Sequence, residues 1–463
     1  MSTQQNDFKL TCHPRGSLRE LWSISFPLML SLMSSSLMFF WDRLLLINYS
    51  VETHNAATSA GAIVSFLQFA FICTTCIAEV FVGRNFGAGK LKQLGVPVWQ
   101  MIWLSFFSVF IFIPLGLFAG NYIFAESRYG LLETEYFSMM MYFGPIFCLA
   151  SALSAFYIGR GRLKFITILV VAANVLNTGL AYVLIFGIKS YIQPMGITGA
   201  ALATGVAQFF QASVLFIDFL RAKNREKYGT GQYKFVWSEF YECMRLGFPS
   251  SIAHTIEILA WAVFFRMLMS MGEEQLTIVS VAQSILFLFT FLTEGISKGA
   301  TAIAANMIGA QQWSGLRKLL FSGVKFYLFL FVIFGIFLAL DPTPFIRVFL
   351  GNESAVSNEV LALIVSSCVW VWIFFLFDGI HWLVVGLLTS AGDTKFILKV
   401  GGGSIWLFAL LPTYILLVVQ GHKADMAWAI TAFYGIMTCC IYLFRFFSMR
   451  WKSNLLELES ISV

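Results

Sequence analysis

Residues 20–47 read ELWSISFPLMLSLMSSSLMFFWDRLLLI, and this stretch decides the fold class. It is apolar over most of its length, and a helix that crosses about 30 Å of hydrocarbon needs about 20 such residues. Pro27 near the start and the adjacent charges of Asp42 and Arg43 in the second half interrupt this pattern. The stretch therefore predicts a membrane-spanning helix that carries an ionisable group.

The composition extends this prediction to the whole chain. Hydrophobic residues make up 59% of the 463 residues and charged residues only 12%, and the mean hydropathy is +0.79. A soluble domain carries about a quarter charged residues, because its surface faces water. We therefore predict an all-α integral membrane protein with twelve transmembrane helices, the first at 20–47 and the others at 57–82, 97–120, 131–158, 164–187, 197–219, 247–271, 277–308, 319–340, 357–388, 396–419 and 425–448.

The distribution of Lys and Arg predicts the orientation of these helices. Cytoplasmic loops of membrane proteins carry an excess of Lys and Arg. Most of the basic residues fall in both terminal segments and in every second loop, whereas the alternate loops contain only Arg128, Lys189, Arg347 and Lys423. Both termini are therefore predicted to be cytoplasmic, and the protein is placed in the cell inner membrane as a multi-pass protein.

The sequence repeats itself across a basic stretch at 221–246. Phe26-Pro27 recurs as Phe248-Pro249, and Gly87-Ala88 recurs as Gly309-Ala310, with the same offset in both cases. We predict two pseudo-symmetric six-helix bundles joined by a linker with a flexible Gly-Thr-Gly centre. The predicted segments are a cytoplasmic tail at 1–19, bundles at 20–220 and 247–448, the linker at 221–246 and a second tail at 449–463. Internal repeats of this kind characterise secondary transporters.

Several classes of protein are excluded by the sequence. The basic residues follow the membrane sides, so no nucleic-acid groove is expected. No phosphate-binding GxxxxGK[ST] loop is present, which excludes an ATPase. Cys73 and Cys76 form a CxxC inside an apolar helical run, where buried cysteine usually serves as a small packing residue. We expect no cofactor and no enzymatic activity.

Two acidic residues lie deep in the predicted spans of the second half. Glu257 lies ten residues from the cytoplasmic start of its span, and Asp378 lies about ten residues before the cytoplasmic end of its own. Both are therefore about 15 Å deep at 1.5 Å per residue. Ionisable groups at this depth are costly and mark functional sites. His254 and His381 lie one helical turn from these acids. They could form a proton relay with the acids, or they could be buried polar partners.

Other ionisable residues in the spans have structural explanations as well as functional ones. Asp42 is followed by Arg43, so the two form an ion pair or face a polar cavity. Glu294 and Lys298 are spaced four apart on one helix and can neutralise each other.

Together these features resemble the multidrug and toxic compound extrusion (MATE) family, and its NorM branch in particular. The resemblance covers about 18–448 and includes the proline early in spans one and seven. It includes the stretch from Asn174 to Gln208, with its GITGAALATGVAQ ending, and GLLTSAGDTK at 386–395. Membership implies two six-helix bundles that export small molecules by alternating access.

The resemblance also implies site residues. Asp42, Glu257 and Asp378 fall at the positions of the family's cation-coupling acids, and the last two would hold Na⁺ if that is the coupling ion. Asn174, Asn177 and Thr204 match a polar site of the N-terminal half. The chain departs from the pattern at Ala181, where some members carry an aspartate. This departure favours cation coupling through Glu257 and Asp378 over a cation site in the first half.

We therefore expect a cation-coupled antiporter, driven by H⁺ or Na⁺, that exports amphipathic and cationic small molecules. Aromatic residues near the acids are Trp261, Phe265 and Trp382, and such rings can stack on a flat cation. The expected partners are the cargo, the coupling cation and membrane lipids, and we expect a monomer.

Two alternatives remain open. A lipid-linked-sugar flippase of the same superfamily would need several basic residues in its cavity to bind pyrophosphate, and the spans offer only Arg43, Arg266 and Lys298. A polytopic membrane transferase would need large catalytic loops, and the predicted loops are short.

Overall fold

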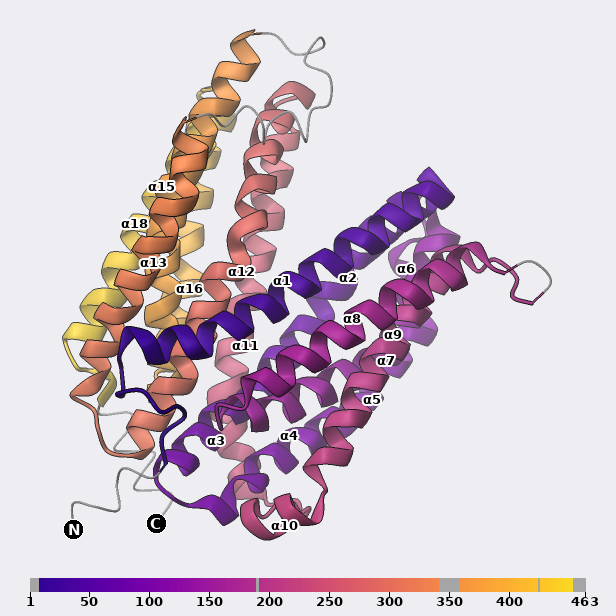
Figure 1. Cartoon of the computed structure of the whole chain (residues 1–463). Helices are drawn as coiled ribbons and strands as arrows, with labels where there is room; N and C mark the ends of the chain where they lie inside the picture. The colour runs from indigo at the N-terminus through magenta and orange to yellow at the C-terminus, as the bar shows by residue number, and fades with distance from the viewer. Residues whose placement is uncertain (1–7, 189–190, 341–357, 424, 453–463) are drawn as a thin grey trace. The chain divides into compact units, whose positions relative to one another are not determined.

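The computed structural model describes residues 8–188, 191–340, 358–423 and 425–452, and the chain within them is helical (Figure 1). Besides helices, these residues contain one isolated bridge, between Ile188 and Ile192. The prediction of an all-α protein is confirmed. The helices are α1 (Leu18–Tyr49), α2 (Val51–Cys76), α3 (Ala78–Gly87), α4 (Gly95–Phe107), α5 (Val109–Pro114), α6 (Gly120–Ile123), α7 (Gly130–Ile158), α8 (Leu163–Phe186), α9 (Gly196–Phe219), α10 (Ala222–Tyr228), α11 (Trp237–Met269), α12 (Glu273–Gly309), α13 (Gly315–Leu340), α15 (Asn358–Ala391), α16 (Thr394–Ile405), α17 (Leu411–Thr413) and α18 (Asp425–Phe447).

The helices match the predicted membrane spans. Ten helical segments of the described residues are long and apolar enough to cross a membrane, and α12 supplies an eleventh as two parts bent by 46°. The helix α13 occupies the place of the predicted span at 319–340. Some spans join short pieces: α4, α5, a π-helical turn at Leu115–Ala119 and α6 follow one another within Leu91–Ile123. Apolar side chains of this span, such as Phe110 and Phe118, are exposed on the protein surface. Exposed apolar side chains are expected where a membrane helix faces lipid.

The chain forms two compact units. Unit 1 comprises Met1–Leu10, Leu30–Ser251 and Ile308–Gln311, and unit 2 comprises Thr11–Met29, Ile252–Met307 and Gln312–Val463. The divisions inside α1 and α11 fall at equivalent places in the sequence repeat, since they follow Met29 and Ser251. Each of these residues comes shortly after one of the two repeated prolines, Pro27 in α1 and Pro249 in α11. The bundle limits inferred from the loops stay a prediction.

Each unit has its own apolar core. In unit 1, α7 packs against α2, α4 and α9, and α8 packs against α9. The fully buried side chains there include Phe112, Phe137 and Met141. In unit 2, α15 packs against α18 and α13, around the buried rings of Tyr327 and Trp428.

The stretch predicted as a linker belongs to unit 1, and its Gly-Thr-Gly centre, for which we expect flexibility, is bonded to neighbouring helices. Thr230 is fully buried, and its hydroxyl donates to the carbonyl of Phe219 at 2.7 Å. Polar side chains of α4 reach the linker backbone and satisfy groups that the coil leaves unpaired. These bonds are Trp99 Nε1 to the Thr230 carbonyl (2.7 Å), Trp103 Nε1 to the Tyr233 carbonyl (2.9 Å), Gln100 Nε2 to the Lys234 carbonyl (3.2 Å), and the Val236 amide to Gln100 Oε1 (3.1 Å).

A buried arginine fastens the start of the linker. The Arg160 guanidinium follows the end of α7 and lies 3.7 Å from the Phe156 ring centroid, 5.2 Å from that of Tyr157 and 4.4 Å from that of Tyr228 on α10. Burial lowers the pKa of Arg160 to about 10, so the side chain still carries its charge at neutral pH. A cation enclosed by three rings is attracted to each of them.

Replacing Tyr228 by Ala is therefore expected to loosen α10. The loss of one partly desolvated cation–π contact amounts to about 1–2 kcal/mol. Amide hydrogen exchange over residues 221–236 should accelerate several-fold. Tyr228→Phe is the matched control, because it keeps the ring and removes only the hydroxyl that is hydrogen-bonded to Arg160, so its exchange should accelerate less than that of the Ala variant. Equal protection in the Ala variant would mean that the α4 contacts alone hold the linker.

Candidate functional site

Unit 1 contains a polar cluster built from three helices. Asp42 on α1, Asn177 on α8 and Thr204 on α9 are each at most 9% exposed. Asn177 Nδ2 donates to Thr204 Oγ1 at 3.1 Å, and that hydroxyl lies 3.4 Å from Asp42 Oδ2. Two oxygens, Asp42 Oδ1 and Asn177 Oδ1, are buried without a hydrogen-bond partner. Two unpaired acceptors in one cluster suit a proton, a cation or a bound water.

Arg43 completes the electrostatics of this cluster. Its guanidinium carbon lies 5.9 Å from the Tyr136 ring centroid on α7, and its charge acts on the Asp42 carboxylate. Gly61 on α2 makes room for it, because a Cβ there would lie 2.7 Å from Arg43 Nη2. The sequence revealed Arg43 as a charge within a span, but nothing in it indicated Tyr136 or Gly61.

Asn174 lies on the same helix as Asn177 but makes different contacts. It is one turn away, and its Nδ2 donates to Ser34 Oγ on α1 at 2.8 Å and approaches Ser35 Oγ at 3.5 Å. Further along, Ser31 Oγ donates to Thr167 Oγ1 on α8 at 3.0 Å. The predicted polar site of the first half therefore continues as a series of bonds between α1 and α8.

Unit 2 contains a cluster of carboxylates. Asp378 on α15 has Glu257 on α11 and Glu294 on α12 as electrostatic neighbours, and the Trp382 side chain is hydrogen-bonded to it. The structure thus brings together the two acids that the sequence singled out. It adds Glu294, for which a structural pair with Lys298 was one of the explanations. Carboxylates that act on one another repel, and a bound cation between them would relieve this repulsion.

The two histidines have different surroundings. His254 Nδ1 lies 3.8 Å from Glu257 Oε2, and its ring stacks on Trp382 with centroids 5.0 Å apart and an interplanar angle of 2°. His381 is buried and meets the edge of the Tyr442 ring at 4.5 Å. Its electrostatic neighbours are Glu257 and His254. His254 therefore lies beside Glu257, whereas the ring contact of His381 is with Tyr442.

The predicted aromatic residues separate into two groups. Trp382 belongs to the carboxylate cluster through its contacts with Asp378 and His254. Trp261 and Phe265 stack on each other at 6.4 Å, and Trp261 also meets Phe374 and the buried Trp428. Of the three residues, Trp382 is the one hydrogen-bonded to Asp378, and the His254 ring covers one face of its indole.

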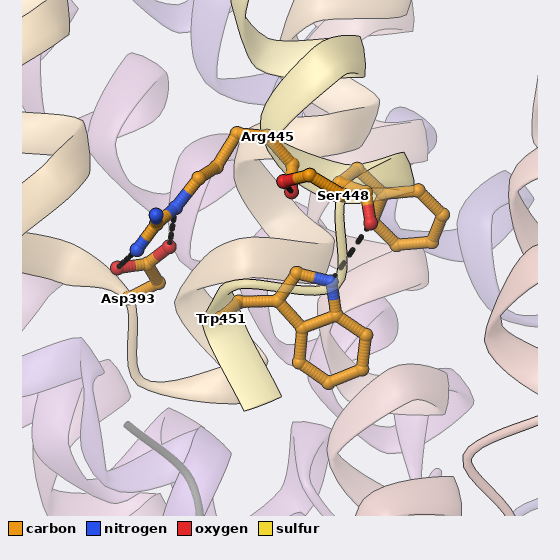
Figure 2. Close-up of polar contacts among 5 residues, drawn as sticks. Asp393, Arg445, Ser448 and Trp451 are labelled. Atoms are coloured by element: carbon orange, nitrogen blue, oxygen red, sulfur yellow. Dashed lines mark hydrogen bonds and ion pairs between the residues drawn. The ribbon is translucent and has the colours of Figure 1, made fainter. Parts of the chain in front are cut away.

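Unit 2 contains an ion pair between α18 and the turn that precedes α16. Asp393, in the turn between α15 and α16, is 1% exposed and accepts two hydrogen bonds from Arg445 of α18, at 2.7 Å and 3.1 Å. Figure 2 shows the guanidinium facing the carboxylate, with Trp451 folded back beneath so that its Nε1 donates to the Phe446 carbonyl at 3.0 Å. The pair joins α18 to the turn that precedes α16. Asp393 belongs to the GLLTSAGDTK stretch noted in the sequence, but nothing there paired it with Arg445.

In the part of the chain that the structure describes, no three His, Cys, Asp or Glu side chains are placed to hold a metal ion together.

Comparison with known proteins gives consistent matches over the whole chain. The MatE family model matches residues 27–183 and 249–415, more than half of the sequence, and the two matched segments begin at the repeated prolines. The "Probable multidrug resistance protein NorM" of Thermotoga maritima is 24% identical over 446 residues, covering 94% of this chain and 93% of that protein. The protein of the same name from Pseudomonas syringae is 23% identical, covering 96% and 98%.

Solved structures share the fold. A crystal structure of MATE in complex with MaL6 superposes with a TM-score of 0.82 at 16% identity, covering 96% of this chain and 98% of that one. An outward-facing multidrug resistance MATE family transporter of the MOP superfamily gives a TM-score of 0.80 at 14% identity, covering 98% and 99%.

Proposed function

This chain belongs to the MatE family of membrane transporters, and from that premise we propose that it is a cation-coupled multidrug antiporter. The NorM relatives that span its full length are described as probable multidrug resistance proteins. The observation that supports the coupling is the electrostatic interaction of Asp378 with Glu257, from a second helix of unit 2, and with Glu294. Acidic groups are costly to bury in the membrane, so their presence at this depth indicates a functional site.

We propose that H⁺ or Na⁺ enters from outside and binds at Glu257 and Asp378, and that Asp42 serves as a separate acid in unit 1. A Na⁺ ion would be a transported ligand, held by the two carboxylates. Binding must favour one conformation of the two bundles, since a ligand with equal affinity for both shifts nothing. Alternating access then converts the inward movement of the cation into export of cargo.

The cargo class follows from the same cluster. Trp382 is hydrogen-bonded to Asp378. Carboxylates attract positive charge, and an indole face beside them suits a flat aromatic cation. We propose amphipathic cations as cargo. His254, 3.8 Å from Glu257, is the residue we propose to exchange a proton with that acid, and His381 stands behind it as a second member of the relay.

A lipid-linked-sugar flippase is the second candidate, and Arg43 is the observation in its favour, because its Nη1 is buried without a hydrogen-bond partner. The pair of acids in unit 2 favours the antiporter, since carboxylates repel pyrophosphate.

Transport in inverted membrane vesicles tests the proposal. A pH gradient and a Na⁺ gradient are imposed separately while the fluorescent cation ethidium is followed. Ethidium should accumulate with one gradient and not with an equal gradient of K⁺, and vesicles from cells without the protein are the control. If neither gradient moves ethidium or any other organic cation, coupling by these acids is wrong. Movement of a lipid-linked pyrophosphate instead would favour the flippase.

A further inference from the structure

Three sets of polar contacts follow one another along α1 and α8 in unit 1. The first joins Ser31 to Thr167 at 3.0 Å, and the second joins Ser34 to Asn174 at 2.8 Å. The third is the cluster that links Asn177 through Thr204 to Asp42. We call the first two, with Thr178, whose hydroxyl donates to the Asn174 carbonyl at 3.1 Å, the hydroxyl ladder. Ser31 and Ser34 are about one helical turn apart on α1, whereas their partners Thr167 and Asn174 are seven residues, about two turns, apart on α8.

The ladder and the cluster cover about half of the membrane. From Thr167 to Asn177 is ten residues, or about 15 Å along the helix, against a hydrocarbon core of about 30 Å. Thr167 lies on the first turns of α8, at the end where the Lys and Arg distribution predicts the cytoplasm. The ladder thus runs from near that surface to the acid in the interior.

The cluster around Asp42 contains two oxygen atoms whose hydrogen-bonding capacity is not used. Asp42 Oδ1 and Asn177 Oδ1 are buried and have no hydrogen-bond partner. A buried acceptor without a donor costs free energy, and a proton or an ordered water at this place would remove that cost. Among the ionisable groups of unit 1, those acting on this place are Arg43 on α1 and Tyr136 on α7.

Helix packing by itself explains part of the ladder, because hydroxyl and amide groups join helices in lipid. Packing does not require that the bonds form a line ending at a carboxyl group. A hydroxyl both donates and accepts, so hydroxyls with waters between them can pass a proton along such a line.

We propose that the hydroxyl ladder is the route by which a proton bound at Asp42 leaves for the cytoplasm. The proton dissociates from the Asp42 carboxyl group, passes by way of Asn177-bound water and the hydroxyls of Ser34, Ser31 and Thr167, and is taken up by cytoplasmic water. In this route the hydroxyls of Ser31, Ser34 and Thr167 carry the proton themselves. The inference rests on the proposed function and adds a path to it.

The test uses the full-length protein in proteoliposomes and compares two reactions. Net antiport is driven by a pH gradient and requires proton release, whereas exchange of labelled for unlabelled ethidium at equal pH requires none. The Ser31→Ala/Thr167→Val variant should slow net antiport about five- to tenfold, as expected when a hydrogen-bonded step is removed. Ethidium exchange and thermal stability should stay at the wild-type level, and the slowed antiport should show a larger solvent deuterium isotope effect.

Two controls separate a route from packing. Ser36→Ala removes an exposed hydroxyl that donates to the Leu32 carbonyl of its own helix, and it should behave as wild type. Thr167→Ser keeps the hydroxyl and should also keep net antiport. Parallel loss of antiport and exchange in Ser31→Ala/Thr167→Val, or wild-type antiport in that variant, overturns the inference and leaves the antiporter standing. Wild-type protein that moves ethidium with a Na⁺ gradient but not with a pH gradient also overturns the inference alone. Wild-type protein that moves no ethidium with either gradient overturns the proposed function itself.

Discussion

Replacing Asp378 by Asn is expected to abolish gradient-driven ethidium transport while the protein still inserts in the membrane. Asp378 interacts with two other carboxylates, Glu257 and Glu294. An amide neither takes up a proton nor carries the charge that holds Na⁺. The coupling ion therefore no longer binds one conformation of the protein more tightly than the other, and it cannot drive transport. Accumulation should fall to the level seen without a gradient, and Glu257→Gln should give the same loss.

The matched control is Asp425→Asn. Asp425 lies in the first turn of α18 and accepts a hydrogen bond from Ser366 at 3.0 Å, a role that an amide oxygen can fill. This variant makes the same chemical change in the same unit and should transport normally. Vesicle transport with matched protein amounts is the measurement. Normal pumping by both Asp378→Asn and Glu257→Gln would show that these acids are not the coupling site.

The largest loss of stability is expected from Arg445→Met. This change leaves the Asp393 carboxylate, 1% exposed, without its two hydrogen bonds from Arg445. Removing one partner of a buried ion pair costs about 3–5 kcal/mol. Unit 2 should therefore unfold at a clearly lower temperature, measured from tryptophan fluorescence of the purified protein in detergent.

A double-variant cycle checks the cause of this loss. Asp393→Ala leaves the Arg445 side chain, which is 20% exposed and can reach water, so its cost should be smaller. Asp393→Ala/Arg445→Met removes the uncompensated charge and should recover part of the stability lost in Arg445→Met. If the two single losses simply add in the double variant, the ion pair does not couple the turn to α18.

The membrane fold could be predicted from the sequence because it depends on composition and length. Apolar runs of about 20 residues have few alternatives in lipid, where every backbone group must be bonded within its own helix. The repeat was visible for a similar reason, since Pro27 and Pro249, like Gly87 and Gly309, mark the same helix positions in both halves. Acids such as Glu257 and Asp378 stood out because charge is rare in lipid.

The contacts of these residues depended on the tertiary structure. No pattern in the sequence places Glu294 with Asp378, pairs Asp393 with Arg445, or sets the Gly61 position against the Arg43 guanidinium. Such pairings join different helices, and helical periodicity reports only which residues share a face of one helix. The linker shows the same limit: Gly-Thr-Gly predicts flexibility, and nothing in the sequence indicated that side chains of α4 would bond its backbone. The sequence therefore determined which groups enter the membrane, and the packing of the helices decided which of them meet.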